Sequence, residues 1–334
     1  MSIRIQDVAR AANVSVSTVS RVLNDRYGVA PETYQRVRKV IDDLGYSSSL
    51  AARSMRGRTN VIGVITFHLS LSFNTEVIRG IDRVVEAHGY DLMVYTSNRT
   101  NHKGDPAWER KVVTQLNGSI VDGMIVLTPL TSNLPDHHPL VVIEPCDEGG
   151  FPAVLSTNRA GTREAVEYLI NLGHRRIGFL GGHPRLLSAR QRRQGYEDAH
   201  RQAGLPILAE LYAEGNYLRE GALTAAFQLL TLPEPPTAIM AANDQSALVV
   251  LEVARQLRLR VPQDVSVIGF DNIPESAYTD PPLTTVDQGL VAMGSRAGEL
   301  LIQRLEGRQV ENRLFELPTR LVVRESCRAI PGAT

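Results

Sequence analysis

The sequence has few of the residues and runs that mark secreted, metal-binding or membrane proteins. Its 334 residues include only two cysteines, Cys146 and Cys327, which lie far apart and match no metal-ligand spacing. We interpret them as free thiols in a reducing compartment. No long apolar run occurs, and the N-terminus has no apolar signal segment. These absences predict a cytoplasmic protein that neither spans a membrane nor is secreted.

Motifs of the main enzyme classes are also missing. No Ser/His/Asp or Cys/His combination has supporting context, and His137 and His138 stand in a proline-bounded loop without partner ligands. The glycine-rich segment 178–183 lies in mid-chain and has the wrong spacing for a dinucleotide-binding turn. We therefore expect no catalytic residue, no metal and no cofactor. A Rossmann-type enzyme is the weaker alternative.

Charge is present in balance, but it is unevenly distributed. The formal net charge is zero, whereas residues 1–58 carry ten Lys or Arg and five acidic residues, a net charge of +5. The remainder therefore carries −5. A basic head on an acidic body suits a polyanion partner that binds the head alone.

Three short helices are predicted within the head. Val8 and Ala9 lie on one face of a first helix that ends near Asn13, a residue that tolerates the left-handed backbone of a tight turn. Ser15 can cap a second helix, which runs through Leu23. A third helix opens at a proline, carries an apolar stripe and stops at a glycine: Pro31, Val37, Val40, Ile41, Leu44 and Gly45. This is a helix-turn-helix arrangement.

The outer face of the second helix is predicted to read DNA. Val16, Ser17 and Arg21 lie away from its apolar face. In the major groove Arg21 can pair with a guanine, and Val16 can touch a thymine methyl group. The alternative is that Arg21 is a solvated charge or a phosphate contact.

Several motifs of the sequence resemble those of a known protein family. Segment 14–24 (VSVSTVSRVLN), the Gly45–Tyr46 pair and segment 51–54 (AARS) resemble the lac repressor (LacI/GalR) family, and the resemblance covers essentially the whole chain. It implies double-stranded operator DNA as the partner, with further DNA contacts from Thr18, Asn24, Ala52 and Arg53. No heptad-repeat tail is present, so we expect a homodimer.

Two positions depart from the family pattern. Arg4 stands where relatives have a capping threonine, so the first helix is expected to start less sharply. Met55 stands where the family has a leucine that wedges into the minor groove of the operator. Methionine is also an accepted wedge residue, and the alternative is that Met55 only packs one hinge against its twin.

From residue 61 onward, apolar runs alternate with amphipathic helical stretches. A helix is predicted at 75–88, and strands at 61–67, 92–96, 123–128, 140–144, 177–181, 238–242 and 265–270. This alternation implies parallel sheets covered by helices on both faces, and the length implies two lobes. The resemblance implies a periplasmic-binding-protein-like body, with the chain crossing between lobes near 157–158, 286–290 and 318.

The predicted fold is thus an N-terminal all-α helix-turn-helix head plus an α/β body of two parallel-sheet lobes. The expected domains are a DNA-binding domain at 1–46 and a hinge at 47–59, followed by two lobes. The N-terminal lobe comprises 60–158 plus 289–318, and the C-terminal lobe 159–288 plus 319–330.

Polar residues that follow strands predict a ligand site between the lobes, because ligands of open α/β lobes sit at the carboxyl ends of the strands. Three such residues follow predicted strands here. The resemblance adds an arginine, a tyrosine and a phenylalanine to the same site. The predicted effector-binding residues are Phe73, Glu144, Arg192, Tyr217, Asn243 and Asp271.

This set of side chains points to a sugar or sugar derivative. Carboxylates and a guanidinium satisfy vicinal hydroxyls, and an aromatic ring covers the C–H face. Asn74 stands where purine-binding relatives have a stacking aromatic residue, which argues against a nucleobase. The alternatives are that Asn243 and Asp271 cap helices, that Arg192 forms a surface ion pair, and that the three remaining residues are structural.

Together these features predict a repressor that a small carbohydrate releases from its operator. A corepressor role for the ligand stays open. A sugar-binding transport receptor would share the body but not the DNA-binding head, and it is the main alternative.

Overall fold

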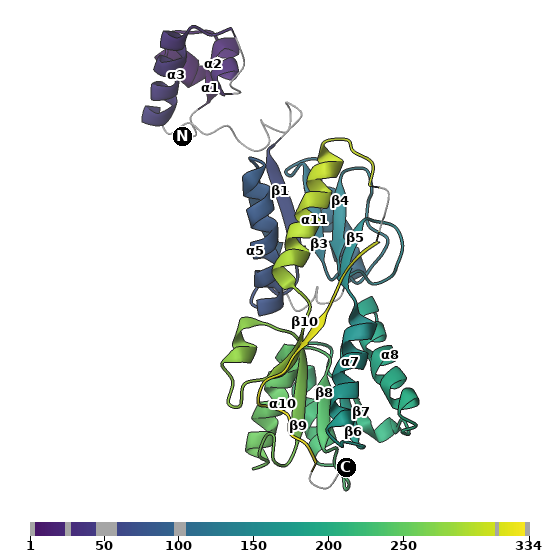
Figure 1. Cartoon of the computed structure of the whole chain (residues 1–334). Helices are drawn as coiled ribbons and strands as arrows, with labels where there is room; N and C mark the ends of the chain where they lie inside the picture. Colours follow the sequence, from purple (N-terminus) through teal and green to yellow (C-terminus); the bar gives the residue numbers. More distant parts are fainter. Residues whose placement is uncertain (1–3, 24–27, 45–58, 97–104, 311–313, 331–334) are drawn as a thin grey trace. The chain divides into compact units, whose positions relative to one another are not determined.

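The computed structural model describes residues 4–23, 28–44, 59–96, 105–310 and 314–330. The chain divides into two compact units, Met1–Thr59 and Asn60–Thr334 (Figure 1). Four residues predicted to contact DNA, Asn24, Ala52, Arg53 and Met55, lie outside the described residues. Within the described ranges, no helix has the length and apolar character needed to cross a bilayer.

The first unit contains the three predicted helices, which are α1 (Ile5–Ala11), α2 (Val16–Leu23) and α3 (Pro31–Leu44). Asn13, between α1 and α2, has a φ of 52°, the left-handed turn expected of it. Ser15 caps α2, because its Oγ accepts a hydrogen bond from the backbone N–H of Thr18 at 3.1 Å. The buried residues of all three helices share one small core: Val8, Ala9, Ala12, Val19, Val22, Val37 and Ile41.

The start of α1 differs from the expectation of a poorly defined helix end. The Asp7 carboxylate accepts a hydrogen bond from the backbone N–H of Arg4 at 2.9 Å. This contact is the return half of a capping box, and it satisfies one free donor without the threonine that relatives have at this position. The helix therefore begins cleanly at Ile5.

The second unit is built on two six-stranded sheets. The first has the order β11-β5-β4-β3-β1-β2, and all its pairs are parallel. Its strands are β1 (Val61–Thr66), β2 (Asp91–Thr96), β3 (Gly123–Leu127), β4 (Leu140–Ile143), β5 (Ala153–Ser156) and β11 (Leu314–Leu317).

The second sheet has the order β12-β10-β9-β8-β6-β7. Only the outer pair, β10 with β12, runs antiparallel. The strands are β6 (Ile177–Gly181), β7 (Tyr212–Glu214), β8 (Ala238–Ala241), β9 (Ser266–Asp271), β10 (Thr284–Asp287) and β12 (Arg320–Val322). The predicted fold, a helical head with a two-lobed parallel α/β body, is confirmed.

Helices cover both faces of each sheet. On the first sheet, α5 (Ser72–Ala87) and α11 (Leu290–Leu305) pack together on one face and α6 (Pro106–Leu116) lies on the other. On the second, α7 (Asn158–Asn171) and α8 (Leu187–Gln202) oppose α9 (Arg219–Leu230) and α10 (Asp244–Gln256). Because both faces are covered, a strand such as β1 is buried along its whole length.

Several elements differ from the sequence prediction. Helix α5 begins at Ser72, three residues before the predicted start. Strands β5, β7, β10, β11 and β12 were not predicted. Each has only three or four residues and includes a charged or hydroxyl side chain, so it lacks the continuous apolar run that identified the equally short β4 and β8. Short 3₁₀ turns at Ala209–Leu211 and Pro274–Ala277 complete the described elements.

The chain passes between the two sheets three times. The connections are Thr157 between β5 and α7, Gln288–Gly289 between β10 and α11, and Pro318–Thr319 between β11 and β12. The first and third are joined directly, since the Oγ1 atoms of Thr157 and Thr319 lie 2.9 Å apart and Thr319 N–H donates to Thr157 Oγ1 at 3.0 Å. The second connection is joined to the first, because the Ser156 hydroxyl at the end of β5 donates to Gln288 Oε1 at 2.8 Å.

Glycines allow α5 and α11 to pack closely. A Cβ added at Gly80 would lie 2.0 Å from the Val291 carbonyl oxygen, whereas one added at Gly298 would lie 3.0 Å from the Val84 Cβ. A helical Gly→Ala change normally stabilises by up to about 1 kcal/mol. We expect Gly80→Ala to destabilise the body by about 1–3 kcal/mol instead, because the clash is with rigid backbone.

Urea unfolding of both variants checks this prediction. Gly298→Ala is the matched control on the same helix pair, and it should cost clearly less because its neighbour is a side chain that can shift. Equal costs, or a gain in stability from Gly80→Ala, would contradict the close backbone approach.

Candidate functional site

In the first unit, the outer face of α2 is free to meet a partner. Val16 is 42% exposed, and Ser17 and Arg21 are exposed as well. Thr18 is half-buried, and its Oγ1 lies 2.8 Å from the Ser15 Oγ, which also contacts Ser17 Oγ at 2.7 Å. The described residues of the predicted DNA-reading set therefore share one face or end of this helix. Their apolar neighbours Val19 and Val22 fill the core behind it.

In the second unit, a cavity of about 300 Å³ lies at the carboxyl ends of the strands, between the two lobes. This volume is at the lower end of the range for small-molecule sites. The structure brings all six predicted effector residues to its wall, which is lined by Phe73, Glu144, Arg192, Tyr217, Asn243 and Asp271 together with twelve further residues.

Different elements supply these six side chains. Phe73 lies in the first turn of α5, Glu144 directly follows β4, and Asp271 ends β9. Arg192 projects from α8, Asn243 caps α10, and Tyr217 lies in the turn that leads into α9. The polar residues meet because parallel strands deliver their carboxyl ends to one edge of each sheet.

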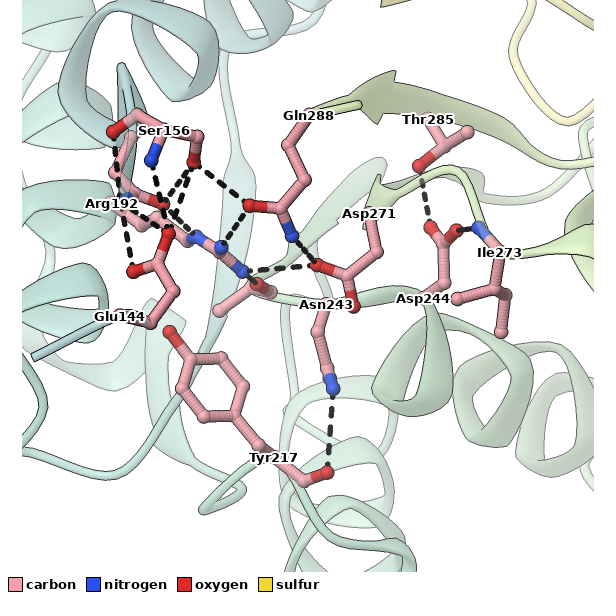
Figure 2. A network of polar contacts seen from close by, with 12 residues as sticks. Glu144, Ser156, Arg192, Tyr217, Asn243, Asp244, Asp271, Ile273, Thr285 and Gln288 are labelled. Carbon is pink, nitrogen blue, oxygen red and sulfur yellow. Dashed lines mark hydrogen bonds and ion pairs between the residues drawn. The ribbon is translucent and has the colours of Figure 1, made fainter. Parts of the chain in front are cut away.

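Arg192 is the centre of a buried polar network (Figure 2). Its side chain is only 4% exposed. The Nε donates to Asn158 Oδ1 at 2.7 Å, one Nη to the Ala242 carbonyl at 2.5 Å, and the other Nη to Gln288 Oε1 at 3.4 Å. A longer contact of 3.5 Å joins the guanidinium to Asp271 Oδ1. The alternative of a surface ion pair for Arg192 is therefore wrong.

Two aromatic rings lie close to the Arg192 guanidinium. Its carbon lies 3.7 Å from the ring centre of Phe270 and 5.6 Å from that of Tyr217. A cation over a ring face gains about 0.5–2 kcal/mol, with the higher values in desolvated places. The Tyr217 ring lies against Gly182, where an added Cβ would come within 2.1 Å of it. A glycine is required there for the ring to reach the cavity.

Glu144 is tied to the first connection between the lobes. Its Oε1 accepts hydrogen bonds from the Ser156 N–H at 3.1 Å and from the Ser156 hydroxyl at 3.3 Å. The Asn158 amide donates to both carboxylate oxygens, at 3.3 and 3.2 Å. Glu144 is 2% exposed. Its carboxylate thus helps to organise the wall of the cavity as well as line it.

Asn243 combines two roles. Its Oδ1 accepts from the Ser246 N–H at 3.0 Å and caps α10, and its Nδ2 donates to the Tyr217 carbonyl at 3.3 Å. The capping role considered for Asn243 is therefore real, and it does not remove the residue from the cavity wall.

Asp271 carries the most perturbed carboxyl group of the cavity. Burial raises its pKa from 3.8 to about 7; Arg192 acts in the opposite direction, and the nearby Glu144 adds to the rise. The Gln288 amide donates to its Oδ1 at 2.5 Å. Behind it, burial also raises the pKa of Asp244, which accepts hydrogen bonds from the Ile273 N–H and the Thr285 hydroxyl. Asp271 caps no helix, so that alternative does not hold for it.

The backbone around the cavity is strained. Nine described residues other than glycine have a positive φ, and five of these line this cavity: Thr128, Glu144, Asn216, Tyr217 and Asp271. Such conformations cost about 1–3 kcal/mol each outside glycine and persist only where the surroundings enforce them. Their concentration here is typical of a preorganised binding site.

Sequence reasoning missed two central residues, Asn158 and Gln288. Both lie at connections between the lobes, which the sequence located only as crossing points. Neither lines the cavity, whereas Thr66, Asn74, His183 and Ser188 do, and no binding role was predicted for these four. No group of three or more potential metal-ligating side chains occurs within the described ranges.

A three-helix unit that exposes the outer face of α2, together with a ligand-sized cavity between two lobes, defines the class of ligand-responsive DNA-binding regulators. Two family models match the chain: "Bacterial regulatory proteins, lacI family" at residues 4–49 and "Periplasmic binding protein-like domain" at residues 166–327. The chain belongs to the lacI family of bacterial regulatory proteins, and it is a helix-turn-helix transcriptional repressor.

Relatives and solved structures agree with this assignment. The transcriptional repressor PurR of Vibrio vulnificus is 34% identical, with 98% of this chain and 99% of that protein covered. The lac repressor dimer bound to operator and the anti-inducer ONPF is 27% identical, with a TM-score of 0.83 and coverage of 98% and 100%. The regulator CelR in complex with cellobiose is 28% identical, with a TM-score of 0.70 and coverage of 97% and 99%.

The Asp271→Asn variant should lose a pH dependence of stability. The pKa of Asp271 in the folded state, about 7, lies above its ordinary value of 3.8. The folded protein therefore binds this proton more tightly than the unfolded chain, and stability falls as the pH rises from about 4 to about 7. Asparagine can keep the oxygen that accepts from Gln288, and it has no proton to release.

We expect the Tm of Asp271→Asn minus the Tm of the unsubstituted protein to increase as the pH is raised from about 5 to about 8. The exposed Asp264 provides a matched control, because Arg260 lowers its pKa and it stays ionised throughout this interval. A relative Tm that is as flat for Asp271→Asn as for Asp264→Asn would contradict the costly burial of the Asp271 charge.

Proposed function

We propose that the protein binds a pseudo-palindromic operator as a homodimer and that a small carbohydrate bound between the lobes releases it. In this proposal residues 1–46 read DNA and 47–59 form a hinge. The N-terminal lobe is 60–158 plus 289–318, and the C-terminal lobe is 159–288 plus 319–330. The protein acts in the cytoplasm, where its DNA is, and catalyses no reaction.

The DNA half of the proposal is supported by the exposed face of α2 and the +5 charge of residues 1–58. Val16 and Arg21 make the base contacts, with Ser17 and Thr18 beside them. Asn24, Ala52, Arg53 and Met55 complete the DNA contacts in this proposal. The solved lac repressor dimer bound to operator, which resembles this chain over 98% of its length, supports the same mode of binding.

One observation supports a small carbohydrate as the ligand. The six predicted side chains line one cavity between the lobes, and the backbone of several lining residues is strained. Two carboxylates, an amide and a guanidinium suit the hydroxyls of a sugar, and Tyr217 suits its C–H face. The CelR structure, which holds cellobiose and resembles this chain, supports a sugar or sugar derivative.

Release follows from the way the cavity is built. Glu144, Arg192 and Asp271 contact a ligand and also hydrogen-bond to Asn158 and Gln288 at the connections between the lobes. A ligand that prefers one degree of lobe closure changes these connections, and through them the spacing of the two DNA-binding units. It shifts the equilibrium only by its difference in affinity for the two arrangements.

A thermal-shift screen of monosaccharides, disaccharides and sugar phosphates tests the proposal, with each hit added to the complex of protein and labelled operator. We expect a hit to raise the Tm and to lower the affinity for the operator. Tighter operator binding would make the ligand a corepressor and overturn release. Asp271→Ala should abolish the response to the hit while operator binding persists, and loss of both would indicate a folding defect.

Arg21→Ala should weaken operator binding by about 1–3 kcal/mol and relax the preference at one symmetric base position. Anisotropy titrations against operators substituted at each position measure this. A uniform loss on all sequences, with a shallower dependence on salt, would make Arg21 a phosphate contact.

A further inference from the structure

A buried glutamate lies behind one wall of the interlobe cavity. Glu109, on α6, is 0% exposed and is not one of the residues that line the cavity. Both of its carboxylate oxygens accept a hydrogen bond from the backbone N–H of Leu130, at 2.9 and 3.2 Å. Leu130 itself lines the cavity. The carboxylate thus holds a segment of chain that forms part of the ligand site.

The segment that Glu109 holds, residues 128–131, directly follows β3. At its start, the N–H of Thr128 donates to the Ile143 carbonyl oxygen at 2.8 Å, and Thr128 has a φ of 47°. Thr128 also lines the cavity. A positive φ outside glycine persists only where neighbouring contacts enforce it. The bond from Leu130 to Glu109 is such a contact, two residues further along the chain.

The residue before Glu109 supports the cavity as well. The ring centre of Trp108 lies 4.9 Å from that of Phe67, which lines the cavity, and 6.0 Å from that of Tyr95. Trp108 is buried, and it is the one tryptophan of the sequence. Its fluorescence therefore reports on changes around α6.

Burial places the ionisation of Glu109 close to neutral pH. It raises the pKa of the carboxyl group from 4.5 to about 7, whereas the backbone N–H groups of Leu130 and Thr131 act in the opposite direction. The charge of Asp105, which caps the same helix, adds to the rise. The side chain therefore gains or loses its charge when the pH changes around neutrality.

A second titratable group beside Glu109 is the thiol of Cys146, on the segment after β4. Burial raises its pKa to about 11, and the charges of Asp147 and Glu109 add to the rise. Arg190 acts in the opposite direction, and its guanidinium donates to the Cys146 carbonyl oxygen at 2.8 Å. A thiol with this pKa stays neutral while Glu109 changes its charge.

Protonation weakens the hold of Glu109 on the segment. An ionised carboxylate offers two acceptor oxygens, whereas the protonated acid has one carbonyl oxygen and one O–H donor. A hydrogen bond to an ionised acceptor is also about twice as strong as one between neutral groups. Both contacts of the Leu130 N–H therefore become weaker when Glu109 binds a proton.

We infer that Glu109 is a positioning residue of the ligand site, which holds residues 128–131 in place when its carboxyl group is ionised and loosens them when it is protonated. Ligand affinity then depends on pH through a residue that the ligand does not touch. This second statement rests on the proposed function, whereas the first concerns the protein without a ligand.

Amide hydrogen exchange of the full-length protein, followed by NMR at about pH 6 and about pH 8, measures this hold directly. The readout is the protection factor of the Leu130 amide, which compares its exchange rate with that of an unstructured amide at the same pH. Trp108 fluorescence is followed over the same range. The unsubstituted protein is compared with Glu109→Gln, because glutamine keeps one acceptor oxygen and has no proton to release.

Three control variants separate Glu109 from other titrating groups. Glu86→Gln is the same change at an exposed glutamate of α5. His68→Gln and His102→Gln each remove a histidine, the residue type that ordinarily titrates close to neutral pH. His68 lies on the cavity wall, and His102 lies outside the described residues.

We expect the Leu130 protection factor of the unsubstituted protein to rise about three- to tenfold between about pH 6 and about pH 8. In Glu109→Gln it should keep the lower value at both pH values. Trp108 fluorescence should show a transition near pH 7, the pKa of Glu109, that is absent in Glu109→Gln and present in the three controls.

The effect on binding is measured with cellobiose, D-galactose and D-ribose at the same two pH values. Asp271, on the cavity wall, also has a pKa of about 7, so the contribution of Glu109 is the part of the pH dependence that Glu109→Gln removes. For a sugar that binds, we expect the increase in affinity with pH to be about three- to tenfold larger in the unsubstituted protein than in the variant.

Three outcomes overturn the inference. The first is a Leu130 protection factor of the unsubstituted protein that does not change with pH, a result that needs no variant. The second is a fluorescence transition that survives Glu109→Gln or is lost in a histidine variant. The third is a sugar whose affinity has the same pH dependence in both proteins. If no sugar binds but Leu130 responds as expected, the proposed carbohydrate ligand is contradicted and the positioning role of Glu109 stands.

Discussion

The buried charge of Arg192 is the constraint on which the rest of the body depends. A guanidinium taken out of water is tolerated only if its donors are paired, and removing one partner of a buried pair costs about 3–5 kcal/mol. Its partners here are Asn158 and Gln288 at two connections between the lobes, the carbonyl of Ala242, and Asp271 at the end of β9. Satisfying this one side chain thus ties α8 to the ends of two strands of the second sheet and to two of the connections between the lobes (Figure 2).

The same arrangement makes binding and lobe geometry inseparable. Glu144 holds Ser156 and Asn158 on one side of the guanidinium, and Gln288 bridges to Asp271 on the other. The third connection joins the first through Thr157 and Thr319. A ligand that hydrogen-bonds to either carboxyl group competes with bonds that tie the connections together. The cavity wall and the connections are linked by direct hydrogen bonds, because Glu144, Arg192 and Asp271 line the cavity and bond to Asn158 or Gln288.

The sequence predicted those parts of the molecule that follow from periodicity and strand ends. Apolar runs located seven strands, and a polar residue after a strand located Glu144, Asn243 and Asp271, because parallel strands share an edge. Asn158 and Gln288 were not predicted, because their role depends on which segments come together in space. The orientation of the Asn74 amide depends on a carbonyl six residues away that only the fold brings near. Short strands such as β10 and β12 gave no pattern to detect.

Two kinds of local cost coincide at the cavity. Strained backbone occurs at Thr128, Asn216 and Tyr217, and the Thr66 Oγ1 and Asn74 Oδ1 have no hydrogen-bond partner among the described residues. The cores of both lobes, in contrast, are apolar and fully buried at positions such as Phe179 and Ile143. A chain selected for stability alone would relax such costs by substitution, for example with glycine at a positive φ. Their concentration on one wall is typical of a binding site, where strained backbone holds polar groups in place for a bound molecule.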